Sequence, residues 1–179
     1  MDQPDRRAAI VVQPDEGESF WQPVPANGYA EVKISRRNVP ANDKFSMGVQ
    51  LIAPGSHVRE HWHDANEEIL FFFEGTGTAV VNGVEHPIVP GTTIYIPPFN
   101  KHKLINDGDT DLKMMWMLMP GGLEDFFEAI GRRRQPGEPA PAPFPRPENA
   151  AEIEADTVFA RLEAERSAGD DRDPRTGRG

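Results

Sequence analysis

The sequence contains no cysteine among its 179 residues. A disulfide framework, a thiolate metal site and a cysteine nucleophile are therefore excluded. Because a reducing compartment does not support disulfides, we expect a cytoplasmic protein. Long apolar runs are missing too, since none approaches the roughly 20 residues of a membrane span. The polar N-terminus MDQPDRRAAI does not resemble a signal peptide, so we expect no membrane partner.

Basic residues are scarce relative to acidic ones. The chain has 19 Lys and Arg against 29 Asp and Glu, which gives a formal net charge of −10. A surface of this sign repels phosphate backbones, so nucleic acid is not an expected partner. Turn-forming residues are plentiful instead, with 18 prolines and 16 glycines, and they indicate short elements with many corners.

The middle of the chain alternates short apolar segments with turn signals, a pattern typical of an antiparallel sandwich or barrel. Asn82-Gly83 is the strongest hairpin signal, because both turn positions require a positive φ. Phe20 and Trp21 are expected to dock on the core without starting an element. The predicted strands are residues 10–12, 29–35, 45–51, 69–73, 78–81, 84–89, 92–96, 102–106 and 112–119.

Three features of these strands predict which side chains face inward. In the segment 45–51, Met47 and its apolar alternates are expected on the buried face. The segment 69–73 is apolar on both faces, as in a strand inside a sandwich. In LKMMWMLM, Met115 and Met117 are expected to point outward and their neighbours inward.

Beyond residue 120 the period changes from two to that of a helix. Apolar residues at 123, 126, 127 and 130 predict a short helix that Gly131 ends. Six prolines in residues 136–147 predict an extended strap, and a final helix is expected from Asn149 to about residue 166. The expected regions are 1–44, packing on the β core; 45–120, the core; 121–167, the helices and strap; and 168–179, a disordered tail.

Histidines and a carboxylate are grouped in the segment HWHDANEEIL. His61 and His63 are two residues apart, so a strand would project both from one face. Glu68 follows after a short turn, although Glu67 competes with it for the same role. His102 lies well downstream, where a barrel can bring it across the same cavity. Imidazole and carboxylate groups together predict a divalent metal site.

Two spacing motifs surround these residues. One reads Gly55-x5-His61-x-His63-x4-Glu68-x6-Gly75, and the other reads Gly91-x5-Pro97-x4-His102-x3-Asn106. In this respect the chain resembles the cupin superfamily over residues 45–120. The resemblance implies an all-β fold, a jelly-roll β-barrel with short C-terminal helices here.

The same resemblance implies one metal ion bound by His61, His63, Glu68 and His102. The six-residue gap to the final glycine of the first motif favours Glu68 over Glu67. The departure from the second signature is Phe99, which stands where the signature has a glycine that shapes a turn. His57 is interpreted as a loop residue and His86 as part of a turn, and Asn106 is expected to hold a backbone turn.

Three imidazoles and one carboxylate leave open positions on the ion. Fe(II) is the first expectation, with Mn, Ni and Zn as alternatives. The resemblance to quercetinase-like dioxygenases implies oxidation of a small phenolic or enolic compound, with Glu68 also acting as the catalytic base. The alternatives are a lyase, isomerase or cyclase that uses the metal as a Lewis acid, and a binding protein without turnover.

Large apolar side chains are expected around the cavity. The proposed pocket residues are Met47, Phe71, Phe73, Met114 and Trp116, and the other interpretation of them is ordinary core. The outward methionines of the last strand require a cover. The C-terminal helix and proline strap could supply it, or a second subunit could, so we expect a homodimer.

Overall fold

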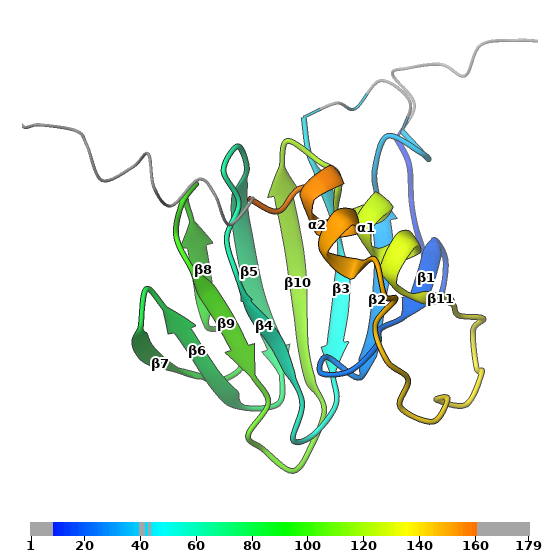
Figure 1. Cartoon of the computed structure of the whole chain (residues 1–179). Helices are drawn as coiled ribbons and strands as arrows, with labels where there is room; N and C mark the ends of the chain where they lie inside the picture. Colours follow the sequence, from blue (N-terminus) through cyan, green and yellow to red (C-terminus); the bar gives the residue numbers. More distant parts are fainter. Residues whose placement is uncertain (1–8, 40–41, 43, 161–179) are drawn as a thin grey trace, which may run out of the picture.

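The computed structural model describes residues 9–39, 42 and 44–160. Its β-strands form two antiparallel sheets (Figure 1). The strands are β1 (Glu18–Trp21), β2 (Gly28–Ile34), β3 (Ser46–Ile52), β4 (His57–His61), β5 (Glu67–Glu74), β6 (Gly77–Val81), β7 (Val84–Ile88), β8 (Thr93–Ile96), β9 (His102–Ile105), β10 (Leu112–Met119) and β11 (Arg132–Arg133). The helices are α1 (Leu123–Ile130) and α2 (Ala150–Asp156).

The larger sheet has the order β11-β1-β2-β3-β10-β5-β8, and the smaller sheet has the order β4-β9-β6-β7. Strands that are consecutive in sequence often lie in different sheets, as β4 and β5 do, so the chain crosses between the sheets repeatedly. The predicted all-β jelly roll with short C-terminal helices is confirmed. β1 and β2, from the first 44 residues, extend the larger sheet beside β3.

The β6–β7 hairpin forms where the sequence predicts it. Asn82 has φ 49° and Gly83 has φ 79°, so both central turn residues adopt the left-handed conformation of a tight hairpin. This turn sets the register, with Val81 opposite Val84.

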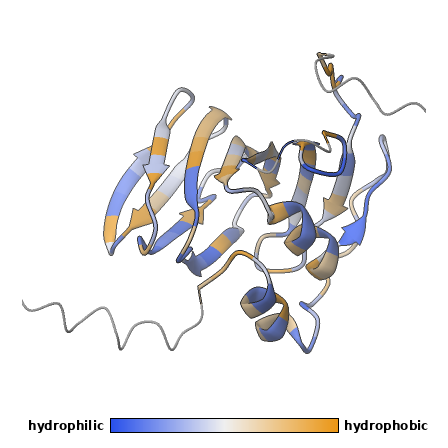
Figure 2. Cartoon of the chain, turned by 90° about the horizontal axis from the view of Figure 1, so that it is seen from above, coloured by the Kyte–Doolittle hydropathy of each residue, from blue (hydrophilic) through white to orange (hydrophobic). Residues whose placement is uncertain are grey.

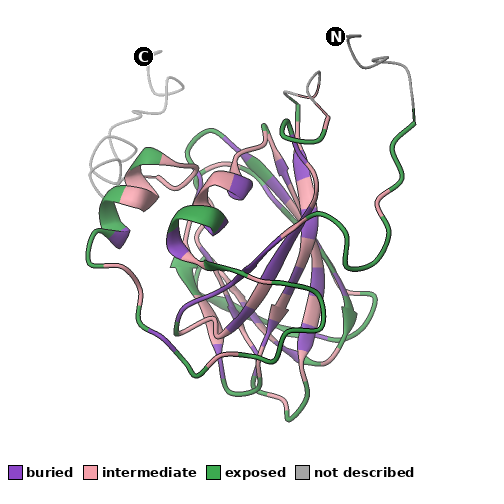
Figure 3. Ribbon diagram, turned by 90° about the vertical axis from the view of Figure 1, so that its right-hand side faces the viewer, coloured by how far each residue is buried: buried purple, intermediate pink, exposed green. Residues whose placement is uncertain are grey.

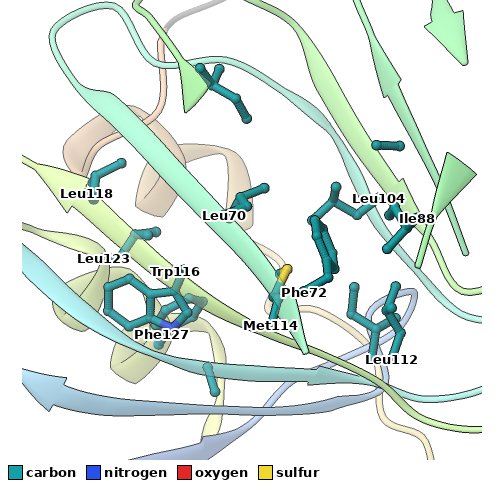
Figure 4. Packing of buried hydrophobic residues seen from close by; sticks show 14 of the residues in the cluster. Leu70, Phe72, Ile88, Leu104, Leu112, Met114, Trp116, Leu118, Leu123 and Phe127 are labelled. Atoms are coloured by element: carbon teal, nitrogen blue, oxygen red, sulfur yellow. The ribbon is translucent and has the colours of Figure 1, made fainter. Parts of the chain in front are cut away.

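The core lies between the two sheets, and the colours of Figure 2 show hydrophobic and hydrophilic residues following one another along the strands. Phe72, Ile52 and Leu112 are fully buried there, and Figure 4 shows Phe72 near Leu104 and Ile88 of the smaller sheet. Nearer the helices, Trp116 packs edge-on against Phe127 at 5.3 Å between ring centroids. Helix α1 is therefore docked on an inward-facing side chain of β10.

The predicted buried face of β3 is wrong. Ser46, Gly48 and Gln50 point inward, whereas Met47 lies on the other face. At Gly48 a bulky side chain already fills the space, because a Cβ added there would lie 2.7 Å from Cζ2 of Trp116. Met47, Val49 and Leu51 therefore mark the outer side of the strand, and its last residue, Ile52, is the apolar residue that points inward.

Four local predictions also need correction. Phe20 and Trp21 are buried as expected but belong to strand β1. Residues 10–12 form no strand, because no other strand pairs with them within the described residues. His57 begins β4 and is not in a loop, and His86 pairs with Ala79 inside β7 and is not in a turn.

The two helices lie over one side of the β structure (Figure 3). Helix α1 has the predicted bounds, but α2 ends at Asp156, about ten residues before the predicted end. The tail predicted for 168–179 lies outside the described residues. Of the part of the chain that the structure describes, no helix is both long and apolar enough to cross a membrane.

Candidate metal centre

Four side chains from both sheets meet at one point. His61 ends β4 and pairs across the smaller sheet with His102, the first residue of β9. His63 follows two residues after β4, and Glu68 reaches in from β5 of the larger sheet. One ligand atom from each residue lies within 4.8 Å of all the others. This group of four, the His/Glu cluster, can hold one metal ion.

Backbone carbonyls fix the orientation of all three imidazoles. Nδ1–H of His61 donates to the carbonyl oxygen of Arg59 at 2.8 Å, and that of His102 donates to Asn100 at 3.1 Å. Nδ1–H of His63 donates to Val158 at 2.7 Å. A carbonyl only accepts, so each Nδ1 carries the proton and each Nε2 has a free lone pair for a metal.

The buried atoms of the cluster lack hydrogen-bond partners. Nε2 of His63, Nε2 of His102 and Oε2 of Glu68 are buried without one. Oε2 of Glu68 lies 2.9 Å from Nε2 of His102 and 3.6 Å from Nε2 of His63. Buried polar groups are normally satisfied, so convergent orphan donor atoms indicate a missing ligand. Nitrogen and carboxylate donors in this arrangement fit a divalent transition metal.

Without a metal, the cluster shifts the pKa values of its members. Burial lowers the pKa of His61, and His102 and His63 lower it further, well below its usual value. Burial raises the pKa of Glu68, but the contacts with His102 and His63 outweigh it and hold this pKa below its usual range. Burial lowers the pKa of His102, but Glu68 outweighs that and raises it. Glu68 is therefore ionised, as a ligand must be.

Glu67 and Glu68 lie on opposite faces of β5, and this decides which of them is near the histidines. Glu68 is 5% exposed and points into the cluster, while Glu67 lies on the exposed face of the same strand. The structure thus places Glu68 where the ligand prediction needs it. That these four residues bind metal stays a prediction.

The unusual Phe99 occupies a left-handed position, with φ 64°. Its N–H donates to the carbonyl oxygen of His63 at 2.7 Å, so this loop lies against the cluster. The second signature has glycine at this position, and the conformation explains why: a residue with a side chain pays a free-energy cost in the left-handed region of φ/ψ space. Asn106 holds the neighbouring turn as expected, donating to the carbonyls of Ile52 and Thr110 at 2.7 and 2.8 Å.

A pocket of about 720 Å³, part of it open to solvent, adjoins the cluster. Three of the four cluster residues line it. Its apolar wall includes Leu70, Met114, Trp116, Phe126, Phe127 and Phe159. Polar lining residues include Gln22, Gln50, His57, Arg59, Arg146 and Glu154. The space suits a small molecule with ring character and a few polar groups.

The pocket prediction from sequence is partly wrong. Met114 and Trp116 line the pocket as expected, but Met47 does not. Phe71 and Phe73 are 39% and 42% exposed, so they point away from the interior. When a strand is apolar on both faces, its sequence does not indicate which face points inward. An error of one residue in the alternation then exchanges the inward and outward side chains.

Several pocket residues escaped the sequence reasoning. Gln50 is 7% exposed and lines the pocket, and no other described residue forms a hydrogen bond with its side chain. Phe126 and Phe127 belong to a helix that the sequence predicts, but the docking of that helix is a long-range property. Phe159 stands alone near the end of the described chain, where no periodic pattern marks it.

Comparison with known proteins agrees with the fold. Residues 48–118 match the family model described as a cupin domain. Protein SchB of Streptomyces halstedii is 31% identical over 74 residues, which cover 41% of this chain and 54% of that protein. Quercetin 2,3-dioxygenase of Bacillus subtilis is 29% identical over 128 residues, covering 72% of this chain and 36% of that protein.

A solved structure of a predicted oxalate decarboxylase from Thermotoga maritima has a TM-score of 0.53 and 23% identity, and the match covers 62% of this chain and 99% of that one. This likeness shows the fold. The matched part of the chain spans between about half and two thirds of the first curated relatives, from 48% to 66%. The family match and the fold together support the resemblance to the cupin superfamily, and the matched cupin domain lies at residues 48–118.

Proposed function

We propose that this cupin is a metal-dependent dioxygenase that acts on a small phenolic or enolic compound. The observation that carries the proposal is a mostly apolar, aromatic pocket lined by three members of the His/Glu cluster. Similarity to a quercetin 2,3-dioxygenase supports it. Iron is the metal that we propose, with Mn, Ni and Zn as alternatives, because imidazole and carboxylate donors suit all four.

The protein residues have separate tasks in this proposal. A metal bound by the cluster would supply the redox or Lewis-acid chemistry. Glu68 presents Oε2 to the same point and accepts the hydroxyl proton of the substrate. Phe126 and Phe127 give the aromatic part of the substrate an apolar surface, and Gln50 offers its amide to a polar substituent.

The test is oxygen consumption across a panel of phenols, diketones and flavonols. We expect at least one compound to consume O2 with the wild-type protein and none with a His61→Ala/His102→Ala double variant. Turnover that continues unchanged under strict anaerobiosis would contradict the dioxygenase. That result would favour a lyase, isomerase or cyclase that uses the metal as a Lewis acid.

We also propose a homodimer. Met115, Phe71 and Tyr95 lie on the outer face of β10, β5 and β8, and Tyr95 is 57% exposed. Helix α1 packs against Trp116 on the other face, so it does not cover them. Light scattering after size-exclusion chromatography should give twice the 19.9 kDa chain mass. A single species of one chain would contradict the dimer.

A further inference from the structure

Residues 157–160 follow α2 (Figure 1), and we refer to them as the C-terminal segment. A hydrogen bond and two ring contacts place this segment beside the His/Glu cluster. Ala160 N–H donates to the carbonyl oxygen of Trp62 at 3.0 Å. The carbonyl of Val158 accepts Nδ1–H of His63 at 2.7 Å. The segment therefore contacts two successive residues: the backbone of Trp62 and the side chain of His63.

The ring of Phe159 lies against two of the cluster histidines. Its centroid is 5.1 Å from that of His61 and 5.2 Å from that of His63. On the side of α1 it packs edge-on against Phe126 at 4.5 Å. Phe159 also lines the pocket, so it forms an apolar wall directly beside the cluster.

Contacts outside the cluster hold the C-terminal segment in place. Glu154 of α2 accepts a hydrogen bond from Arg146 at 2.6 Å and forms an ion pair with Arg59 of β4. Gly122, at the start of α1, makes room for Val158, because a Cβ added there would lie 2.6 Å from Cγ1 of Val158. Helix α2, which leads into the segment, is thus tied to the small sheet and the strap, and the segment itself packs against the start of α1.

The three carbonyl groups that accept hydrogen bonds from the imidazoles lie at different distances along the chain. His61 and His102 each donate to a carbonyl two residues earlier in the chain, so nearby residues of the same segment orient them. His63 donates to a carbonyl 95 residues away. An acceptor on the second nitrogen fixes the tautomer and the ring orientation of a metal-binding histidine.

From these contacts we infer that the C-terminal segment is part of the metal centre. Val158 positions His63 through its backbone carbonyl, and Phe159 shields the bound metal from water. The inference rests on the metal site of the proposed function and assigns a positioning role to residues outside the matched cupin domain. Metal affinity should therefore depend on a segment that contributes no ligand.

The first test removes the anchor of the segment in the full-length chain. Ala160→Pro lacks the N–H that bonds to Trp62, whereas Ala160→Ser keeps it. Zn²⁺ affinity is measured by competition with a chelating dye. We expect Ala160→Pro to bind Zn²⁺ about 10- to 100-fold more weakly and Ala160→Ser to match the wild type. The unfolding midpoint of the metal-free protein should stay close to that of the wild type, because Ala160 lies outside the buried core.

The second test separates shielding from positioning and does not depend on the proline variant folding. Phe159→Ala keeps the backbone carbonyl of Val158 but removes the ring, and Phe159→Leu restores an apolar wall. Transfer of bound Zn²⁺ to excess chelator should be several-fold faster in Phe159→Ala and close to the wild-type rate in Phe159→Leu. Equal transfer rates in all three proteins would overturn the shielding role.

The outcomes distinguish the two proposals. If the wild-type protein binds no Zn²⁺, the metal site fails and the proposed function fails with it. If the wild type binds Zn²⁺ and a folded Ala160→Pro binds it equally well, the positioning role of the segment is overturned while the metal site stands. If Ala160→Pro loses affinity only together with the stability of its metal-free form, the segment is structural and the inference is likewise overturned.

Discussion

Two regions of the interior are built on the same strands but differ in what fills them. The packed region is centred on the fully buried apolar side chains of Phe72, Leu112 and Ile52. The pocket region, beside it, is lined by Gln50 and by His61, Glu68 and His102 of the His/Glu cluster. Atoms of Glu68 and His102 are buried there without a hydrogen-bond partner. Burying such groups costs free energy, so the first region stabilises the fold and the second uses that stability for a site.

The largest effect is expected from removing two of the predicted metal ligands in the pocket region. A His61→Ala/His102→Ala variant should lose metal almost completely, because two of four ligands are gone. In protein purified without chelators, the metal content measured by elemental analysis should fall from near one metal ion per chain to background. Full metal retention by the double variant would contradict the ligand assignment.

The next effect tests the packed region. Phe72→Ala should lower the free energy of unfolding by about 3–5 kcal/mol, because it leaves a cavity in a dense core. Phe71→Ala is the matched control on the same strand, and its half-exposed ring should cost far less. Chemical denaturation measures both. Equal losses would show that the two faces of β5 are wrongly assigned.

A smaller effect should separate binding from stability at Gln50. Gln50→Leu removes a buried amide that has no described partner, so stability should stay within about 1 kcal/mol of the wild type or rise. A substrate found in the oxygen-consumption panel should show a KM about tenfold higher, the effect of losing one hydrogen bond of about 1.4 kcal/mol.

Zn²⁺ affinity should not change in Gln50→Leu. Met47→Leu, on the outer face of the same strand, should leave KM unchanged. An unchanged KM in Gln50→Leu would remove Gln50 from the site.

The smallest effect concerns the loop at Phe99. Phe99→Gly should stabilise the protein by about 0.5–1 kcal/mol, since it relieves a left-handed side chain but increases the freedom of the unfolded chain. Phe99→Leu keeps the strained conformation and should bring no gain. Denaturation midpoints of the three proteins provide the measurement, and a destabilised glycine variant would contradict the strain at this position.

Local signals account for the parts of the structure that the sequence predicts well. Asn82-Gly83 specifies its own turn, and the bounds of α1 follow from its apolar stripe and Gly131. The four cluster residues were identified because their spacing lies within two short motifs. Each of these features depends on residues close together in sequence.

Features that depend on pairing between distant segments were missed. The inward face of β3 is set by Trp116 of β10, so the apolar alternation around Met47 indicated the wrong side. The same reason hides Gln50, whose role appears only once the register against Met114 is known. The contact of Val158 with His63 spans 95 residues and has no sequence pattern at either end.

That last contact also has a consequence for the order in which the protein matures. Chains emerge from the ribosome N-terminus first, so His61, His63, Glu68 and His102 are all synthesised long before Val158. A nascent chain that ends before Val158 has every residue of the His/Glu cluster but lacks the acceptor that orients His63. Under the positioning role proposed for Val158, full metal affinity would be reached only after synthesis has passed this residue.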